Sequence, residues 1–234
     1  MYHEMVSAAM PEQIELLAEL AGPAPMLELG VGTGRLALPL VERGLEVHGL
    51  DVSPAMVECP RAKPGGDQVR VTMGDFPDLE LGTRFRLVFV AFNTPFALPD
   101  QLAQLDCFRA VSRHLVPGGR FLVEAFVPDV PPFHRGQLVS AVGVGLDRVD
   151  LECSVHDPVT QSISTQRLVF GTGGARSYPV KVRYAWPAEL DLMARSPGCK
   201  PRAARESGAD SRSRRALPGT SPSGRVHRHH RPEG

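Results

Sequence analysis

Short apolar runs alternate, in the first half of the chain, with longer segments in which apolar residues recur every three or four positions. The short runs, which we expect to form buried strands, begin at Met26 and continue at residues 46–50, 69–73, 85–92 and 120–126. The longer segments, which we expect to form helices, cover residues 11–20, 35–42, 54–60 and 100–115. This alternation predicts an α/β, Rossmann-like fold, in which helices cover both faces of a doubly wound, mostly parallel sheet.

From Gln137 onward the pattern no longer alternates strand with helix. The strands expected there are separated by turn residues and cover residues 149–155, 162–170 and 180–186. Turn residues such as Asp157-Pro158 favour hairpins over crossover connections. We therefore predict an antiparallel insertion at residues 137–186, after the fifth strand, followed by a helix from Pro187. The inserted sheet would either roof the pocket or form the surface of a homodimer.

The composition changes again at Arg195. Residues 195–234 hold ten basic and three acidic side chains, and Leu217 and Val226 are the only large aliphatic ones. Such a segment buries too little apolar surface to fold alone, so we predict a disordered basic tail. The predicted domain is then residues 1–194, with a cofactor-binding core at 26–126.

The remaining composition favours a cytoplasmic enzyme. The chain has 234 residues, of which 42% are hydrophobic, and this suffices for a core. Lys plus Arg and Asp plus Glu balance at 26 each, which favours neither nucleic acid nor membrane as a partner. We find no signal-peptide pattern and no apolar run of spanning length. Four widely spaced cysteines without a C-x-x-C motif predict reduced thiols and no metal site.

The candidate chemistry begins at the glycine-rich segment after the first predicted strand. Gly30, Gly32 and Gly34 let the backbone turn tightly and approach a ligand without an intervening Cβ. The dinucleotide fingerprint G-x-G-x-x-G needs its third glycine one residue later, where this chain has Arg35. A nicotinamide cofactor is therefore disfavoured.

Two acidic residues lie beside this loop at positions where an acid is informative. Glu28 lies inside the apolar run, where an unpaired carboxylate is costly, so it should accept hydrogen bonds from the loop or reach a cationic ligand. Asp51 ends the second predicted strand, where a carboxylate can accept both hydroxyls of a ribose. Asp51 also precedes Ser53-Pro54, so starting a turn or capping the next helix is an equally open interpretation.

Six segments together resemble a known family; they are LELGVGTGRLALPL, EVHGLDVSPAM, TMGDF, FVAFNT, HLVPGGRFLVEAF and YPVKVRYAWPAELDLMA. Residues 26 to about 194 resemble the class I S-adenosylmethionine-dependent methyltransferases, and are similar in layout to small bacterial amino-sugar N-methyltransferases. Proteins of that family continue with a sixth strand and an antiparallel seventh strand. Since nothing after Arg195 is predicted to form strands, we expect the last two to be missing. The residue composition of the tail suggests a shifted reading frame.

The resemblance implies that S-adenosylmethionine is the cofactor and assigns its contacts to Glu28, Gly30, Gly32, Gly34, Asp51, Val52, Asp75, Phe76 and Asn93. The glycine loop would hold the methionine end, and Asp51 would accept the ribose hydroxyls. Val52 would flank the adenine, while Asp75 would accept its amino group and Phe76 would pack on the ring.

The implied reaction is methyl transfer to a small-molecule nitrogen or oxygen nucleophile, and Glu124 and His134 are the candidate bases. The segment Asn93-Thr-Pro-Phe96 lies where amino-group methyltransferases carry Asn-Pro-Pro-Tyr or Phe, and Thr94 departs from that motif. This departure argues against nucleic acid or protein amides as acceptors. Two alternatives stay open: a non-catalytic Rossmann remnant without its last strands, and an NAD(P)-dependent oxidoreductase.

Overall fold

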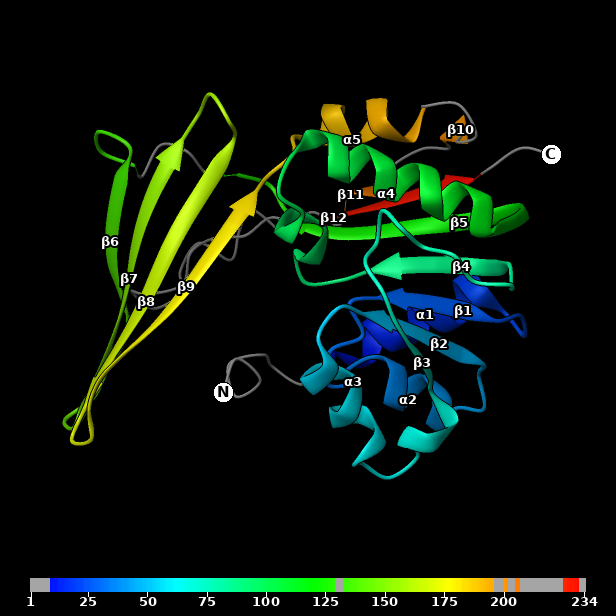
Figure 1. Cartoon of the computed structure of the whole chain (residues 1–234), viewed down its shortest axis with the longest axis horizontal. Coiled ribbons are helices and arrows are strands. Elements are labelled where there is room, and N and C mark those ends of the chain that lie inside the picture. Colours follow the sequence, from blue (N-terminus) through cyan, green and yellow to red (C-terminus); the bar gives the residue numbers. More distant parts are fainter. Residues whose placement is uncertain (1–8, 129–132, 196–199, 202–204, 207–224, 232–234) are drawn as a thin grey trace.

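A computed structural model describes residues 9–128, 133–195, 200–201, 205–206 and 225–231 of the chain. Its larger sheet contains five parallel strands, which are β1 (Met26–Leu29), β2 (Val47–Asp51), β3 (Arg70–Met73), β4 (Phe85–Val90) and β5 (Leu115–Phe126). They lie in the order β3-β2-β1-β4-β5, so the sheet continues outward in both directions from β1 (Figure 1). The predicted parallel, doubly wound sheet is confirmed.

Helices cover both faces of this sheet, and they are α1 (Pro11–Ala21), α2 (Ala37–Glu42), α3 (Pro54–Arg61), α4 (Gln101–His114) and α5 (Pro187–Ala194). Short 3-10 turns follow at Gly66–Gln68 and at Thr94–Ala97, the latter labelled η3. One apolar cluster packs α4 and α5 on one face, and a second packs α1 and α2 on the other. Among the described helices, none combines the length and the apolar character that crossing a membrane requires.

Local signals explain most helix boundaries. Pro11, Pro54 and Pro187 each occupy the first turn of a helix, where the missing N–H is not needed. Asp100 caps α4 by accepting a hydrogen bond from the Ala103 N–H at 2.9 Å. The helix predicted from residue 35 begins only at Ala37, because turns of the glycine loop extend through Leu36.

The second sheet is antiparallel and contains β6 (Gln137–Val144), β7 (Arg148–Asp157), β8 (Ser162–Gly171) and β9 (Gly174–Arg183), in that order. Figure 1 shows it standing apart from the core, joined to it at one end. The predicted antiparallel insertion after the fifth strand is confirmed. Its last strand ends at Arg183 rather than at residue 186, and β6 was not predicted as a separate strand.

The prediction that the chain lacks its last two strands is wrong. After β10 (Lys200–Pro201) and β11 (Arg205–Glu206), strand β12 (Arg225–Arg231) pairs antiparallel with β5, and β10 pairs with β12. The exposed edge of β5 offers unpaired backbone groups, and these can pair with a segment that has few apolar side chains. The rest of the predicted disordered tail, including residues 207–224, lies outside the described residues.

The helix before this region is covered on its apolar side. Leu190 and Met193 are both buried in the core cluster that contains α4. Leu192, on the other side of the helix, is 67% exposed. The apolar side of α5 therefore packs on the sheet face instead of remaining open.

Candidate functional site

The candidate residues gather at the carboxyl edge of the parallel sheet, where β1, β2 and β4 end. In Figure 1 this edge faces the antiparallel sheet. The chain passes from β1 to β2 on one side and β4 lies on the other, so this is where the strand order reverses. In open α/β sheets, ligands bind outside the carboxyl ends of the strands at this point.

The glycine loop after β1 is built from residues with positive φ, at 73° for Gly30, 53° for Gly32 and 77° for Gly34. A Cβ on Gly30 would lie 2.6 Å from Cγ2 of Thr94, and one on Gly34 would lie 3.0 Å from Cγ of Leu38. A Cβ on Gly32 would meet only a backbone oxygen at 3.9 Å. Packing therefore requires the outer two glycines, while the middle one leaves its backbone open to a ligand.

Asp51 joins this loop to the next helix. Its Oδ2 accepts a hydrogen bond from the Gly32 N–H at 2.9 Å, and its Oδ1 accepts one from the Ser53 N–H at 2.9 Å. These two hydrogen bonds show that Asp51 does have the turn-forming role that was one of its two interpretations. A carboxylate has about four lone-pair positions, so two remain for hydroxyl groups of a ligand.

Glu28 is buried in β1, on the sheet face that it shares with Met26, and is 4% exposed. Burial raises the pKa of its carboxyl to about 8, although Arg35 and the Ala37 backbone act in the opposite direction. Among the described residues, its Oε2 atom has no hydrogen-bond partner. A buried acid with an unpartnered oxygen next to the glycine loop fits a cationic ligand.

The predicted adenine contacts lie at the same edge with different exposures. Phe76 is 8% exposed, and its ring lies 3.4 Å from the Cβ position of Gly30. Val52 is 65% exposed, and Asp75 is also exposed. The Asp75 Oδ1 accepts a hydrogen bond from the Phe76 N–H at 2.7 Å, which orients the pair.

Asn93 ties the end of β4 to the end of β5. Asn93 and the preceding Phe92 both have positive φ, at 63° and 55°. The Asn93 N–H donates to the Glu124 carbonyl at 3.2 Å, and its Oδ1 accepts from the Phe126 N–H at 2.6 Å. Positive φ at two successive non-glycine residues is costly, and such strain is concentrated at functional sites.

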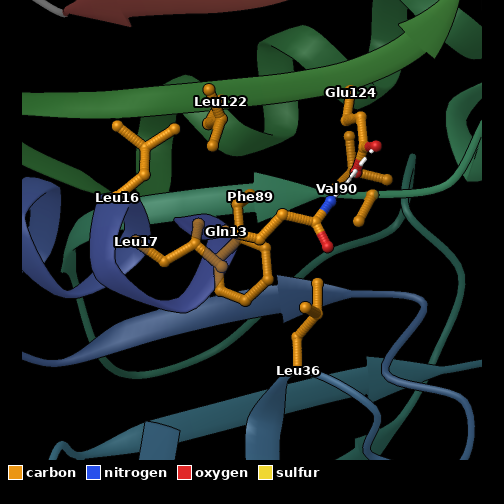
Figure 2. Close-up of a pocket in the computed structure, with 9 residues that line it drawn as sticks. Gln13, Leu16, Leu17, Leu36, Phe89, Val90, Leu122 and Glu124 are labelled. Atoms are coloured by element: carbon orange, nitrogen blue, oxygen red, sulfur yellow. Dashed lines mark hydrogen bonds between the residues drawn. The ribbon is translucent and has the colours of Figure 1, made fainter. Parts of the chain in front are cut away.

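The sequence did not reveal Gln13, which links three elements at this edge. Its side-chain amide donates to Oε2 and Oε1 of Glu124 at 3.2 and 3.3 Å (Figure 2). Its Oε1 accepts from Nη1 of Arg35 at 3.3 Å, and the Arg35 guanidinium lies 5.8 Å from the centre of the Phe92 ring. The usable signal was a polar residue on the apolar stripe of α1, four residues before Leu17.

Beneath this contact lies a small apolar cavity of about 20 Å³ between α1 and the sheet, lined by side chains such as Leu16, Leu36, Phe89 and Leu122 (Figure 2). That volume holds a water-sized molecule and not a nucleoside. The cavity is therefore too small to be the cofactor site.

The two candidate bases occupy different surroundings. Glu124 is 5% exposed and is held by Gln13, whereas His134 is exposed at the start of the antiparallel sheet. The His134 backbone pairs with Gln137 through two hydrogen bonds of 2.9 Å. Within the described part of the chain, no hydrogen bond joins Glu124 to His134.

Comparison with known proteins identifies the family. A model of the methyltransferase domain family matches residues 26–119. The structure of the CcbJ methyltransferase from Streptomyces caelestis is 38% identical in sequence, with a TM-score of 0.82, and the match covers 95% of this chain and 89% of that one. The chain belongs to the class I S-adenosylmethionine-dependent methyltransferases. The oxidoreductase alternative is thereby set aside.

Other relatives of this methyltransferase are consistent with this family. Cypemycin N-terminal methyltransferase from a Streptomyces species is 29% identical over 204 residues, which is 84% of this chain and 82% of that protein. The amino pentose methyltransferase CalS10 from Micromonospora echinaspora, solved with S-adenosylmethionine bound, has a TM-score of 0.68 at 22% identity over 94% of this chain and 89% of that one. At that identity the likeness concerns the fold. S-adenosylmethionine, the cofactor of the family, is cationic at its sulfonium and its ammonium, and Glu28 is the buried acid beside the loop with an oxygen that is unpartnered among the described residues.

Replacing Asp51 by alanine is expected to weaken binding of S-adenosylhomocysteine by roughly 1 to 3 kcal/mol, the range for hydrogen bonds to a charged group. The substitution also removes the acceptor for the Gly32 and Ser53 N–H groups, so thermal unfolding should be measured beside calorimetric binding. Asp51→Asn, which keeps one acceptor oxygen, is the matched control for shape. Unchanged affinity in Asp51→Ala would remove this residue from the site.

Proposed function

We propose that this methyltransferase methylates a nitrogen or oxygen nucleophile of a small molecule bound between the carboxyl edge of the parallel sheet and the antiparallel sheet. The observation that carries the proposal is the polarity of the face that the antiparallel sheet turns toward the core. We define this inner face by Ile163 and Val182, which pack against the core cluster. Farther from the core the same face carries Asp150, Arg148 and Arg167.

The charged group on the inner face is joined by hydrogen bonds. Arg148 donates to both carboxylate oxygens of Asp150, at 2.7 and 3.0 Å, and Arg167 donates to one of them at 2.8 Å. These two arginines lower the pKa of Asp150 to about 2, so the group stays ionised at any physiological pH. A polar, hydrogen-bonding surface on the sheet face that is turned toward the core suits recognition of a polar small molecule.

We further propose that the cofactor contacts are those predicted from the sequence. Three observations support this proposal. The backbone of Gly32 is open to a ligand, Glu28 has an unpartnered oxygen, and Asp51 lies beside the glycine loop. Val52, Asp75 and Phe76 would surround the adenine, and Gly30 and Gly34 would shape the loop. Asn93 would contact the cofactor from the end of β4, which its hydrogen bonds to β5 hold in place.

When bound, S-adenosylmethionine supplies a methyl group on a sulfonium, and the carbon–sulfur bond breaks as the acceptor's lone pair forms the new bond. The chain's own residues then act mainly by orientation, because in-line alignment supplies most of the acceleration. The Gln13–Glu124 contact keeps the wall of the site rigid near the reacting centre. An acceptor that must lose a proton would pass it to Glu124 or to His134.

The names of the relatives favour nitrogen over oxygen. The sugar N-methyltransferase KedS8 is named for methylation at nitrogen, and cypemycin N-terminal methyltransferase is named for an N-terminus, where an amino group is the nucleophile. The two names indicate different acceptors, a sugar in one case and an N-terminus in the other. The proposal is therefore tested with both kinds of amine: methyl-labelled S-adenosylmethionine is incubated with amino sugars, short peptides, hydroxylated analogues and transfer RNA. We expect label in an amine; labelling of RNA alone would contradict the proposal.

The base is identified by comparing Glu124→Gln with His134→Gln once an acceptor is known. Loss of the base is expected to lower kcat by roughly 10²- to 10⁴-fold while leaving S-adenosylhomocysteine binding unchanged. Full activity of both variants over the whole pH range would show that neither residue takes the proton. A fall in both kcat and cofactor affinity for Glu124→Gln would instead mark it as a positioning residue acting through Gln13.

A further inference from the structure

A buried group of polar side chains joins the antiparallel sheet to the core. Arg183, the last residue of β9, is 7% exposed. Its Nη1 donates to Oε1 of Gln104 on α4 at 2.6 Å, and its Nη2 donates to Oε1 of Glu189 on α5 at 2.6 Å. The Gln104 amide also donates to the Arg183 carbonyl at 2.7 Å. Two helices of the core therefore hold one residue of the sheet, at its side chain and at its backbone.

The turn before β8 enters the same group through Gln161. This residue has a positive φ of 52°, which is uncommon for a residue other than glycine. Its amide donates to Oε2 of Glu189 at 2.8 Å and to the Tyr184 carbonyl at 3.1 Å, and its Oε1 accepts from Nη2 of Arg183 at 3.3 Å. Gln101 of α4 donates to Oε1 of Glu189 at 2.8 Å. Two separate points of the sheet are thus tied to the core. We call these polar side chains the joint: Gln101, Gln104, Gln161, Arg183 and Glu189.

Arg183 and Glu189 form the ion pair of the joint, with side chains 8% and 14% exposed. Burial raises the pKa of Glu189, but the hydrogen bonds from Gln161 and Arg183 outweigh it and hold the pKa below its ordinary value. A buried ion pair adds little net stability, because the loss of hydration offsets the attraction between the charges. What it supplies is geometry, since each N–H group must point at its acceptor.

The apolar contacts at this end of the sheet do not fix its tilt. Ile163 and Val182 pack on the core cluster, and apolar burial stabilises such a contact without requiring one direction. Figure 1 shows the rest of the sheet extending away from the core. At about 3.4 Å per residue the 10 residues of β9 span about 34 Å, so a rotation of about 10° would move the far end by about 6 Å. The directional hydrogen bonds of the joint oppose such a rotation.

The joint also reaches the edge of the parallel sheet where the cofactor would bind. The Gln104 amide donates to the Pro95 carbonyl of η3 at 3.2 Å. The residue before it, Thr94, packs so closely on the glycine loop that a Cβ on Gly30 would lie 2.6 Å from its Cγ2. The antiparallel sheet is therefore fastened to the segment that packs against the glycine loop.

We propose that Arg183 and Glu189 are positioning residues, which fix the tilt of the antiparallel sheet and thereby align the acceptor with the methyl group of the cofactor. This inference rests on the proposed function, because it requires an acceptor bound against the inner face of the sheet. Neither residue exchanges a proton with the acceptor, and both act through the sheet that they hold. A misplacement of about 1 Å at the reacting atoms can lower the rate roughly 100-fold.

The test removes the ion pair without leaving an unpaired charge. In Arg183→Met/Glu189→Met, two apolar side chains replace the pair, so the free energy of unfolding should stay near that of the wild type or rise. Arg109→Met/Asp106→Met removes an exposed pair of 2.9 Å from α4 and is the matched control. Arg183→Lys keeps the charge of the pair but loses the planar fork that reaches two acceptors, so it tests the geometry in a second, charge-conserving variant.

The tilt is measured in the full chain as the distribution of distances between two spin labels. One label replaces Leu146, in the exposed far turn of the antiparallel sheet, and the other replaces Glu42, at the exposed end of α2. Both are attached to genetically encoded residues, which avoids the native cysteines, and excess unlabelled protein suppresses distances between copies. We expect a narrow distribution in the wild type and in the α4 control, and one roughly twofold wider in Arg183→Met/Glu189→Met and in Arg183→Lys, because the sheet can rotate without its directional bonds. Equal widths in all these proteins would overturn the proposal.

The second readout is methyl transfer to an amine that the labelling experiment identifies. Arg183→Met/Glu189→Met and Arg183→Lys are expected to lower kcat/KM for that amine roughly 10- to 100-fold, while the dissociation constant of S-adenosylhomocysteine stays unchanged. A loss of kcat/KM that only follows a loss of stability or of S-adenosylhomocysteine binding would assign the pair a merely structural role and overturn the proposal. Wider distances with unchanged kcat/KM would instead contradict the acceptor site on the inner face, and with it the proposed function.

Discussion

Replacing Glu28 by glutamine is expected to stabilise the cofactor-free protein increasingly as the pH rises. The pKa of this carboxyl is 4.5 in its ordinary state and about 8 in the folded protein, because burial disfavours the charged form. Between these values the folded state binds a proton that the unfolded state has released, so stability falls with rising pH. The loss across this window is on the order of 4 kcal/mol, and glutamine does not titrate.

The measurement is the free energy of unfolding in denaturant at pH 5 and pH 9 for both proteins. The difference between variant and wild type should grow by on the order of 4 kcal/mol over this range, since all other groups titrate alike in both. Glu42→Gln, at the exposed end of α2, is the control and should show no such change. Parallel pH curves for Glu28→Gln and wild type would mean that Glu28 is ionised in the folded state.

The same substitution should weaken binding of the cofactor. A cationic ligand favours the ionised form of Glu28, so binding below pH 8 should release a proton and affinity should rise with pH up to that value. Glu28→Gln is expected to lose this pH dependence and to bind S-adenosylhomocysteine roughly 10- to 100-fold more weakly. Calorimetry in buffers of different ionisation enthalpy measures the proton release directly. A gain in stability with a loss of binding is the pattern expected of a strained functional residue.

Removing strand β12 is expected to destabilise the domain strongly. Six residues of β12, from Arg225 to His230, are in register with Phe126 to Phe121 of β5. At about 1 kcal/mol for each backbone hydrogen bond, a chain that ends at residue 224 should lose on the order of 5 kcal/mol of stability. The free edge of β5 would then be available to other chains, so self-association should follow.

Hydrogen exchange locates this effect. Amides of β5 that point toward β12 should exchange slowly in the full chain and rapidly in the chain that ends at residue 224. A chain that ends at residue 231 keeps the whole strand and is the control. Equal stability of the three chains, with equal exchange in β5, would show that β12 contributes nothing to the fold.

The contrast between β12 and the first half of the chain shows where prediction from sequence succeeded. The order of strands and helices up to Phe126 followed from apolar periodicity, because burial acts on each element through its own repeat. The glycine loop was equally local, since only glycine adopts the positive φ at Gly30 and Gly34 without strain. The acids Glu28 and Asp51 were recognisable because each stands next to these elements.

Strand β12 could not be predicted in this way, because its pairing with β5 does not depend on an apolar pattern. Apart from Val226 its residues are all arginine or histidine, and what it contributes is a row of backbone groups that complete the edge of β5. The contact between Gln13 and Glu124 is of the same kind, since the two residues are 111 positions apart. The residues next to Gln13 in the sequence do not indicate a contact with Glu124, and those next to Glu124 do not indicate Gln13.

The sequence by itself determined the parallel core and the glycine loop, because each depends on neighbouring residues and their backbone preferences, and its resemblance to a known family indicated the class of reaction. Tertiary structure alone decided the partner of β5, the anchoring of Glu124 by Gln13, and the face on which the antiparallel sheet presents its charges. Ile163 and Val182 show the reason: alternation divides a strand into two faces, but only packing against the core selects the inner one.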